Sequence, residues 1–149
     1  MYPWAESVHG FSQDMLAQLS ENKIFSDSID EIAQDLRDCT LIMHNVTFDR
    51  KFLQAEFKKC RTEPSRYNEF CTMFHFTPIC NIVLPWKYTP KRPKVSEVLD
   101  FLWVSDSQVL AKAKELYGSD EIGFHDARFD TAALFCALDV YGWEKALVK

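Results

Sequence analysis

The sequence predicts an α/β protein with few strands, built as one domain over residues 1–149. A short apolar run, TLIM at 40–43, is typical of a buried strand, whereas apolar residues elsewhere recur at the three- and four-residue spacings of helices. With 149 residues, of which 47% are hydrophobic, the chain is long enough to bury one core.

Helices and one strand are expected in the first half of the chain. Residues 1–11 look irregular, Ser12 can cap a helix that ends at about residue 20, and Ser26 or Asp27 can cap a second helix. The apolar stripe of this second helix consists of Ile29, Ile32, Ala33 and Leu36. A further helix is expected between the strand and about Cys60, with a stripe that begins with Phe48, Phe52 and Ala55, beside Leu53 and Phe57.

One more strand and several helices are expected in the second half. Residues 61–68 read as a polar loop and 69–75 as a strand, and Thr77 with Pro78 is typical of the start of a short helix. Three prolines make 85–94 a loop. Three helices are expected after this loop. The first carries Val95, Val98, Leu99 and Leu102, and the second starts at Asp106 or Ser107 and ends at Gly118. The third spans about 127–141, with Phe129, Ala133, Cys136 and Val140 on one face.

Composition argues against several classes of protein. A net charge of −5 argues against a protein that covers DNA through non-specific electrostatic binding, because such proteins are normally basic. It does not argue against a nucleic-acid enzyme, since a metal-binding carboxylate site would itself be acidic. The five Cys form no CxxC pair, which favours a reducing compartment. The chain shows no signal-peptide pattern and no apolar run of membrane length, so we expect a cytoplasmic protein without a membrane partner.

A hexapeptide pattern occurs twice, as HNVTFD at 44–49 and HDARFD at 125–130. Each copy places a His, a Phe four residues later and an Asp directly after the Phe. A given His would meet this pattern by chance roughly once in 150 trials. Since the chain holds only four His, two such copies call for an explanation.

Helix geometry limits how each His could act together with its Asp. Five helical residues turn through about 500°, which would leave the two side chains about 140° apart if both lay in the helix. They can face one site only if the His lies in the turn before the helix and the Asp in its first turn. His44 follows the predicted strand and Asp126 is a good cap, so both copies fit this placement.

Two interpretations of these motifs remain open. Carboxylates bind Mg²⁺ through oxygen, two such ions can stabilise a phosphodiester displacement, and a His can take the proton from the attacking water. Alternatively, an Asp in a first helical turn can simply complement the helix dipole, Asn45 or Thr47 can cap, and a His beside a strand can be only hydrogen-bonded. Zinc is not favoured, because the four His have no usual ligand spacing.

These motifs resemble a known family. HNVTFDRKFL resembles the second motif, and HDARFD the third, of the DEDDh 3′–5′ exonucleases, which include the proofreading epsilon subunit of bacterial DNA polymerase III. VHGFS at 8–12, FCTM at 70–73 and KRPKVSEVL at 91–99 are similar to segments that the family carries in the same order. The resemblance therefore covers nearly the whole chain.

The resemblance implies a fold, an activity and a role for each motif residue. The fold would be ribonuclease H-like, a sheet flanked by helices, and the substrates would be single-stranded DNA or RNA 3′ ends. Asp130 would bind the metal directly and Asp49 through water, with two Mg²⁺ or Mn²⁺ ions as cofactors, and His125 would be the general base. The substrate-binding residues would be Val8, His9, His44, Asn45 and Phe48.

The chain departs from the family at the first motif. The family carries an Asp-x-Glu on its first strand, and here that strand and the next two have no counterpart. We therefore expect an N-terminally incomplete fold in which short parallel strands remain, with little or no metal-dependent activity. The strand at 40–43 would have an unpaired edge, which a polymerase or another protein could cover.

Two further classes of function compete with the enzyme. The aromatic and basic residues of 85–94 could make the chain a catalytically inactive protein that binds single strands by stacking, although such a loop is more often only a solvated surface. The chain could also be a protein-interaction module. A module would not need His125, Asp130 and Asp49, which weighs against that alternative.

Overall fold

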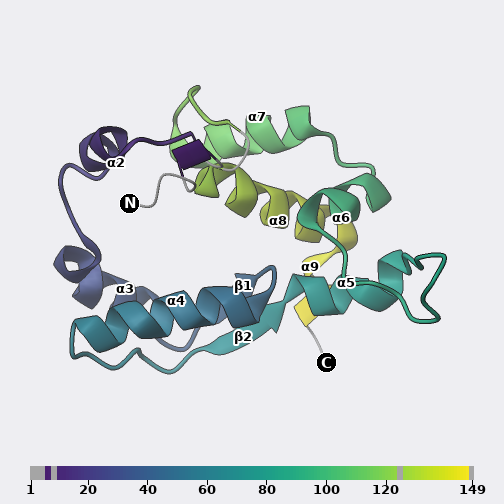
Figure 1. Cartoon of the computed structure of the whole chain (residues 1–149), viewed down its shortest axis with the longest axis horizontal. Coiled ribbons are helices and arrows are strands. Elements are labelled where there is room, and N and C mark those ends of the chain that lie inside the picture. Colours follow the sequence, from purple (N-terminus) through teal and green to yellow (C-terminus); the bar gives the residue numbers. More distant parts are fainter. Residues whose placement is uncertain (1–5, 8–9, 124–125, 148–149) are drawn as a thin grey trace. The chain divides into compact units, whose positions relative to one another are not determined.

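A computed structural model of the chain describes residues 6–7, 10–123 and 126–147. It is an α/β structure made mostly of helices, with a short parallel sheet of two strands in its described part (Figure 1). The chain divides into two compact units, residues 1–42 with 46–70 and residues 43–45 with 71–149.

The first unit opens with helix α2, Gln13–Leu19. The side chain of Ser12 accepts a hydrogen bond from the N–H of Met15 at 3.2 Å, which satisfies one of the unpaired donors at the start of the helix. The predicted helix and its cap are both confirmed.

The next helix starts differently from the prediction. A 3-10 turn, η1 at Phe25–Ser28, precedes helix α3, Ile29–Asp35. Ser28 occupies the cap position of α3 without a side-chain hydrogen bond, whereas the carboxylate of Asp27 accepts from the N–H of Ile24 at 2.9 Å. The prediction that Ser26 or Asp27 caps this helix is therefore wrong, because the 3-10 turn already includes both residues.

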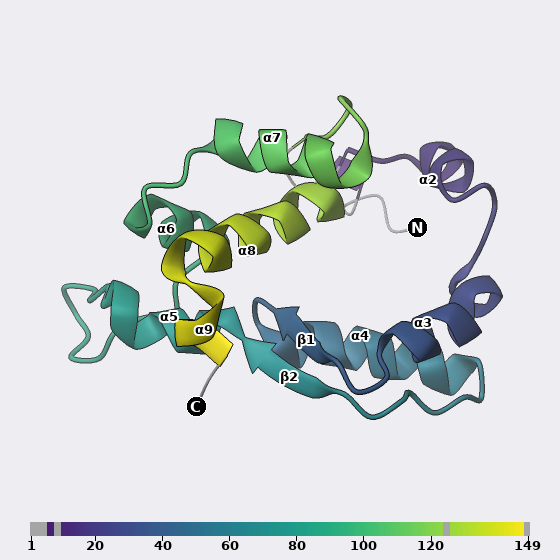
Figure 2. The same ribbon diagram turned by 180° about the vertical axis from the view of Figure 1, so that it is seen from behind.

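A βαβ arrangement forms the centre of the first unit. Strand β1 is Thr40–Met43, helix α4 is Val46–Lys59 and strand β2 is Asn68–Cys71. Helix α4 lies over one face of the paired strands, as the views from both sides show (Figures 1 and 2). The predicted strand at 40–43 has the bounds that the apolar run indicated.

The buried face of α4 differs from the predicted stripe. Phe57 is 1% exposed and its ring meets the Phe25 ring edge-on at 5.7 Å, whereas Phe48 and Phe52 are both more than half exposed. Both faces carry apolar residues at helical spacing, and only the one that contains Val46 and Phe57 is buried.

The first helix of the second unit is α5, Thr72–Cys80, where the prediction had a strand up to residue 75. The hydroxyl of Thr77 donates to the carbonyl of Met73 at 2.7 Å, and Pro78 lies inside the helix. The prediction that Thr77 and Pro78 start a helix is therefore wrong. Pro78 has no N–H to donate to the carbonyl of Phe74, and the helix ends two residues later, before Asn81, which takes a left-handed conformation.

Helices make up the rest of the described second unit. Their bounds are α6 Val95–Phe101, α7 Asp106–Tyr117, α8 Ala127–Tyr141 and α9 Trp143–Leu147. Helix α7 starts at Asp106, is capped by Ser105 and ends at Gly118, so the predicted start and end are both confirmed. Helix α9 was not predicted.

The core of this unit lies between α7 and α8, which run side by side in both views (Figures 1 and 2). Ala113 on α7 and Ala132 and Ala133 on α8 are fully buried, because small side chains let the two helices approach closely. Phe129, Ala133 and Cys136 are buried as predicted, but Val140 is 57% exposed, so its assignment to the buried face is wrong. None of the helices in the described ranges has the length and apolar character to span a membrane.

Candidate functional site

The first copy of the hexapeptide begins at the end of β1 with His44. Its Nδ1 lies 2.9 Å from the hydroxyl of Thr72, and its Nε2 lies 2.9 Å from the carbonyl oxygen of Pro93. A carbonyl only accepts, so Nε2 carries a hydrogen and donates it. The single hydrogen of the Thr72 hydroxyl is donated to the carbonyl of Met43 at 3.1 Å. His44 thus ties the end of the strand to the start of α5 and to the segment before α6.

Asn45 makes the turn between β1 and α4. Its φ of +71° is left-handed, a conformation that Asn adopts more readily than most residues. Helix α4 begins at the next residue, Val46. The conformation supplies a structural reason for an Asn at this position.

Phe48 and Asp49 occupy the first turn of α4. Phe48 is 58% exposed and stacks at a tilt on Phe52, with ring centroids 4.9 Å apart. The Asp49 carboxylate is half-buried and near the positive end of the helix dipole, which stabilises a negative charge.

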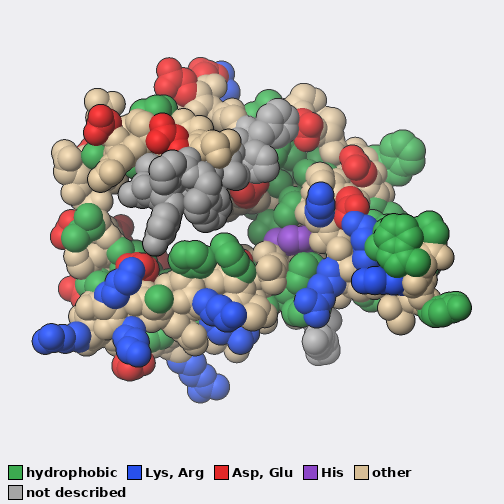
Figure 3. All heavy atoms as spheres, viewed as in Figure 1, with side chains coloured by type: hydrophobic (Ala, Val, Ile, Leu, Met, Phe, Trp, Pro, Cys, Tyr) green, Lys and Arg blue, Asp and Glu red, His purple; other side chains and the backbone are tan. Residues whose placement is uncertain are grey.

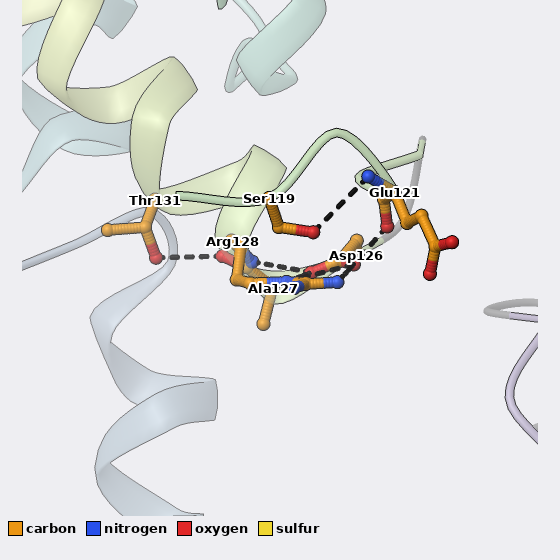
Figure 4. Close-up of polar contacts among 6 residues, drawn as sticks. All are labelled: Ser119, Glu121, Asp126, Ala127, Arg128 and Thr131. Carbon is orange, nitrogen blue, oxygen red and sulfur yellow. Dashed lines mark hydrogen bonds and ion pairs between the residues drawn. The ribbon is translucent and has the colours of Figure 1, made fainter. Parts of the chain in front are cut away.

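The second copy begins helix α8 through a side-chain cap. Asp126 is 5% exposed, and its Oδ1 accepts from the N–H of Arg128 at 2.9 Å (Figure 4). The Arg128 guanidinium also pairs with both carboxylate oxygens and donates to the carbonyl of Glu121 at 3.3 Å. These bonds to Arg128 hold the pKa of Asp126 below its ordinary value. The predicted cap is confirmed, and its reinforcement by Arg128 was not predicted.

Asp130 lies in the first turn of α8 and is exposed, whereas the preceding Phe129 is buried. The Asp130 N–H donates to the carbonyl of Asp126 at 3.0 Å, which is the first regular bond of the helix. The cap therefore fixes the turn that carries the Asp130 carboxylate.

The structure thus describes five of the eight predicted site residues. His44, Asn45 and Asp130 belong to the second unit, and Phe48 and Asp49 to the first. Val8, His9 and His125 lie outside the described residues, so their assignments stay predictions. His125 directly precedes the Asp126 cap in the sequence.

The donor chemistry of Asp49 and Asp130 suits a hard cation such as Mg²⁺, which prefers carboxylate oxygen. Within residues 6–7, 10–123 and 126–147, however, no three side chains of His, Cys, Asp or Glu form a group that could hold a metal ion. Two carboxylates alone are too few for a two-ion centre. The described residues therefore include the type of donor atom that Mg²⁺ prefers, but no described group has enough ligands to hold the ion.

Comparison with known proteins supports the predicted family relationship. The chain is 28% identical over 85 residues to the DNA polymerase III subunit epsilon of Salmonella typhimurium, a match that covers 57% of this chain and 34% of that protein. It is 28% identical over 74 residues, 48% of this chain, to the 3′–5′ exonuclease DinG of Staphylococcus epidermidis, where the match covers 8% of the protein. The epsilon subunit of Escherichia coli K12 is 27% identical over 85 residues.

The chain spans about a third of the length of these epsilon subunits. No family model and no solved structure matches it. The chain is nevertheless related to the epsilon-like 3′–5′ exonucleases. The predicted family relationship is confirmed.

Proposed function

We propose that this chain carries the second and third catalytic motifs of a 3′–5′ exonuclease that hydrolyses phosphodiester bonds at the 3′ ends of single-stranded DNA or RNA. One observation carries the proposal. Both copies of the hexapeptide place Phe as the third and Asp as the fourth residue of a helix, with the His two residues before that helix. The relationship to the exonucleases suggests why the placement is repeated, since each motif would supply one Asp to a shared catalytic site.

Each motif residue then has a distinct role. Asp130 would bind Mg²⁺ or Mn²⁺ directly, Asp49 would bind through water, and His125 would take the proton from the attacking water. The bound ions would stabilise the charge that develops on the phosphate oxygens. The substrate contacts would come from Val8, His9, Asn45 and Phe48, while His44 would hold the segment around them in place.

The number of carboxylates determines how active residues 1–149 can be alone. A two-ion site of this family needs four carboxylates, and Asp49 with Asp130 supplies two. We therefore propose that residues 1–149 are a ribonuclease H-like exonuclease domain that lacks its first motif, and that they hydrolyse nucleic acid slowly or not at all. A polymerase or another protein that pairs with the edge of β1 is the partner this fold would accept.

A nuclease assay on 5′-labelled single-stranded DNA and RNA tests this proposal. Residues 1–149 are compared with the longest in-frame product of the gene, in Mg²⁺, Mn²⁺ and EDTA. If the coding sequence upstream supplies an Asp-x-Glu strand, we expect the longer product to shorten the label stepwise from the 3′ end. Asp49→Ala and Asp130→Ala should each slow that reaction at least about a hundredfold, because each loses several kcal/mol of charge stabilisation.

Asp14→Ala, in the first turn of α2, is the matched control because it removes an Asp from a helix start outside both motifs. Robust degradation by residues 1–149 that vanishes in Asp130→Ala would contradict the proposed low activity. Degradation that survives both motif substitutions would contradict the proposed site.

A catalytically inactive single-strand binding protein is the second candidate function. It is favoured by the exposed aromatic and basic loop between α5 and α6. Salt-sensitive binding that persists in Asp130→Ala, without hydrolysis by any product of the gene, is the outcome that would favour it.

A further inference from the structure

The segment between α5 and α6 differs in charge from the rest of the protein. Residues 82–94, which we call the anchored loop, read IVLPWKYTPKRPK and contain three Lys and one Arg but neither Asp nor Glu. The whole chain has a net charge of −5. The anchored loop is therefore a local positive region on an acidic protein, and a polyanion is the partner that its charge complements.

Both ends of the anchored loop are fixed. The N–H of Lys91 donates to the carbonyl of Ile82 at 2.8 Å, which closes the loop on itself. Pro93 is buried, and its carbonyl accepts from His44 Nε2 at 2.9 Å. Inside the loop the N–H of Lys87 donates to the carbonyl of Leu84 at 2.9 Å. These bonds order the backbone of the loop, so the loop would lose less conformational entropy when a ligand binds.

Two aromatic side chains extend from the ordered backbone into solvent. Trp86 is 74% exposed and Tyr88 is fully exposed. Figure 3 shows hydrophobic and Lys or Arg side chains gathered together over the region between α5 and α6. Neither ring contributes to the core, and an exposed aromatic on a rigid loop offers a flat face on which a base can stack.

Two of the four loop cations are held by neighbouring side chains outside the loop. Lys91 pairs with both carboxylate oxygens of Glu97, and the Arg92 guanidinium lies over the Phe74 ring at 4.7 Å from its centroid. Lys87 lies between the two aromatic residues in the sequence and is exposed. Alternating aromatic and cationic groups match a single strand, whose bases and phosphates alternate in the same way.

We propose that the anchored loop binds single-stranded nucleic acid, with bases stacked on Trp86 and Tyr88 and phosphates neutralised by Lys87 and its neighbouring cations. The inference rests on the proposed function, since a 3′–5′ exonuclease must hold the strand that leads to the end it cuts. It names a surface outside both hexapeptide motifs. Because every base has an aromatic face, binding should depend weakly on sequence.

Fluorescence anisotropy with 5′-fluorescein dT15 and U15 tests the proposal in EDTA, where no metal-dependent hydrolysis occurs. Trp86→Ala and Tyr88→Ala should each weaken binding about five- to a hundredfold, the range for the loss of one stacked base. Trp86→Phe should retain most of the affinity. Trp103→Ala is the matched control, because Trp103 is 91% exposed in the same unit but lies between Asp100 and Asp106.

A salt titration separates the charge contribution from stacking. The logarithm of the binding constant falls as the logarithm of the salt concentration rises. Lys87→Ala should make this negative slope shallower by about 0.7, the value for one phosphate contact on a single strand. Lys145→Ala, an exposed cation on α9, should leave the slope unchanged. The dT15 and U15 probes show whether the strand is DNA or RNA.

The proposal is overturned if Trp86→Ala and Tyr88→Ala bind like the parent chain, or if Trp103→Ala loses as much affinity as they do. It is also overturned if the loop variants lose binding to anionic vesicles but not to either oligonucleotide. Circular dichroism melts confirm that each variant is folded. Because binding is measured without metal, the loop variants can show the expected loss of binding even if no hydrolysis is seen in the nuclease assay. The two proposals are therefore tested separately.

Discussion

In both copies of the hexapeptide the Phe is the third residue of its helix and the Asp the fourth, yet their burial is reversed. Phe48 is 58% exposed and Asp49 half-buried, whereas Phe129 is 7% exposed and Asp130 exposed. The starts of the helices differ too, with a left-handed Asn45 in one and an Asp126 side-chain cap in the other. The same spacing therefore sets a position along a helix but not the face that is buried.

The largest expected difference concerns the two Phe residues. Phe129→Ala should lower the free energy of unfolding by about 3–5 kcal/mol, because it removes a buried ring and leaves a cavity, whereas Phe48→Ala should cost about 1 kcal/mol or less. Urea denaturation followed by circular dichroism measures both. Equal losses would show that the Phe48 side chain is buried in solution and would remove the contrast between the copies.

His44 should matter next, because it joins three segments of the second unit. His44→Ala should cost about 2–3 kcal/mol, since two hydrogen bonds are lost and the Pro93 carbonyl loses its donor. Thr72→Ser keeps the hydroxyl and serves as the control, with a small expected change. A loss below about 0.5 kcal/mol, which is the usual size for a surface substitution, would mean that His44 is not a structural bridge.

Asp126→Ala should lower stability by about 1–2 kcal/mol at pH 7, through the lost helix cap. The pKa of Asp126 is lower in the folded protein than in the unfolded chain, so its contribution is present above the unfolded pKa and is lost as pH falls through the folded pKa. The difference between the parent and Asp126→Ala should therefore shrink in acid. Urea midpoints at pH 7 and at about pH 3 check this, and an unchanged difference would contradict the role of the carboxylate charge.

The smallest effect is expected at Asn45. Asn45→Val should cost about 1 kcal/mol, since a β-branched residue disfavours φ of +71°, while Asn45→Gly should be nearly neutral. Thermal melts of the two variants decide the matter. If Val and Gly behaved alike, the turn would not require a left-handed residue, and Asn45 would be needed for another reason.

The sequence predicted best where a local signal had no competitor. The run TLIM, the cap at Ser12, the loop at 85–94 and the helix at 127–141 were all confirmed. Each depends on neighbouring residues alone, such as an apolar run, a hydroxyl at a helix start or a cluster of prolines.

The sequence predicted poorly where distant contacts decide. The segment 72–75 has the β-branched and aromatic residues of a strand but forms the start of α5. Likewise, the exposed stripe of Phe48 and Phe52 could not be told from the buried face of α4, because the choice depends on what packs against it. Of the candidate site, the helix positions of Asp49 and Asp130 followed from spacing, but the bonds from His44 to Thr72 and Pro93 cross 28 and 49 residues and leave no local pattern.

The bond from Lys91 to Ile82 also closes off the tip of the anchored loop, residues 83–90, from helices α5 and α6 on either side of it. Residues 83–90 begin and end at one closed pair of backbone groups, so a change in their number alters mainly the entropy of closure, at about 0.6 kcal/mol for a doubling of length. Helices α5 and α6 would keep their places while the tip is exchanged. This segment is therefore suited to grafting, and tips of different length or aromatic content could be transplanted onto one unchanged scaffold.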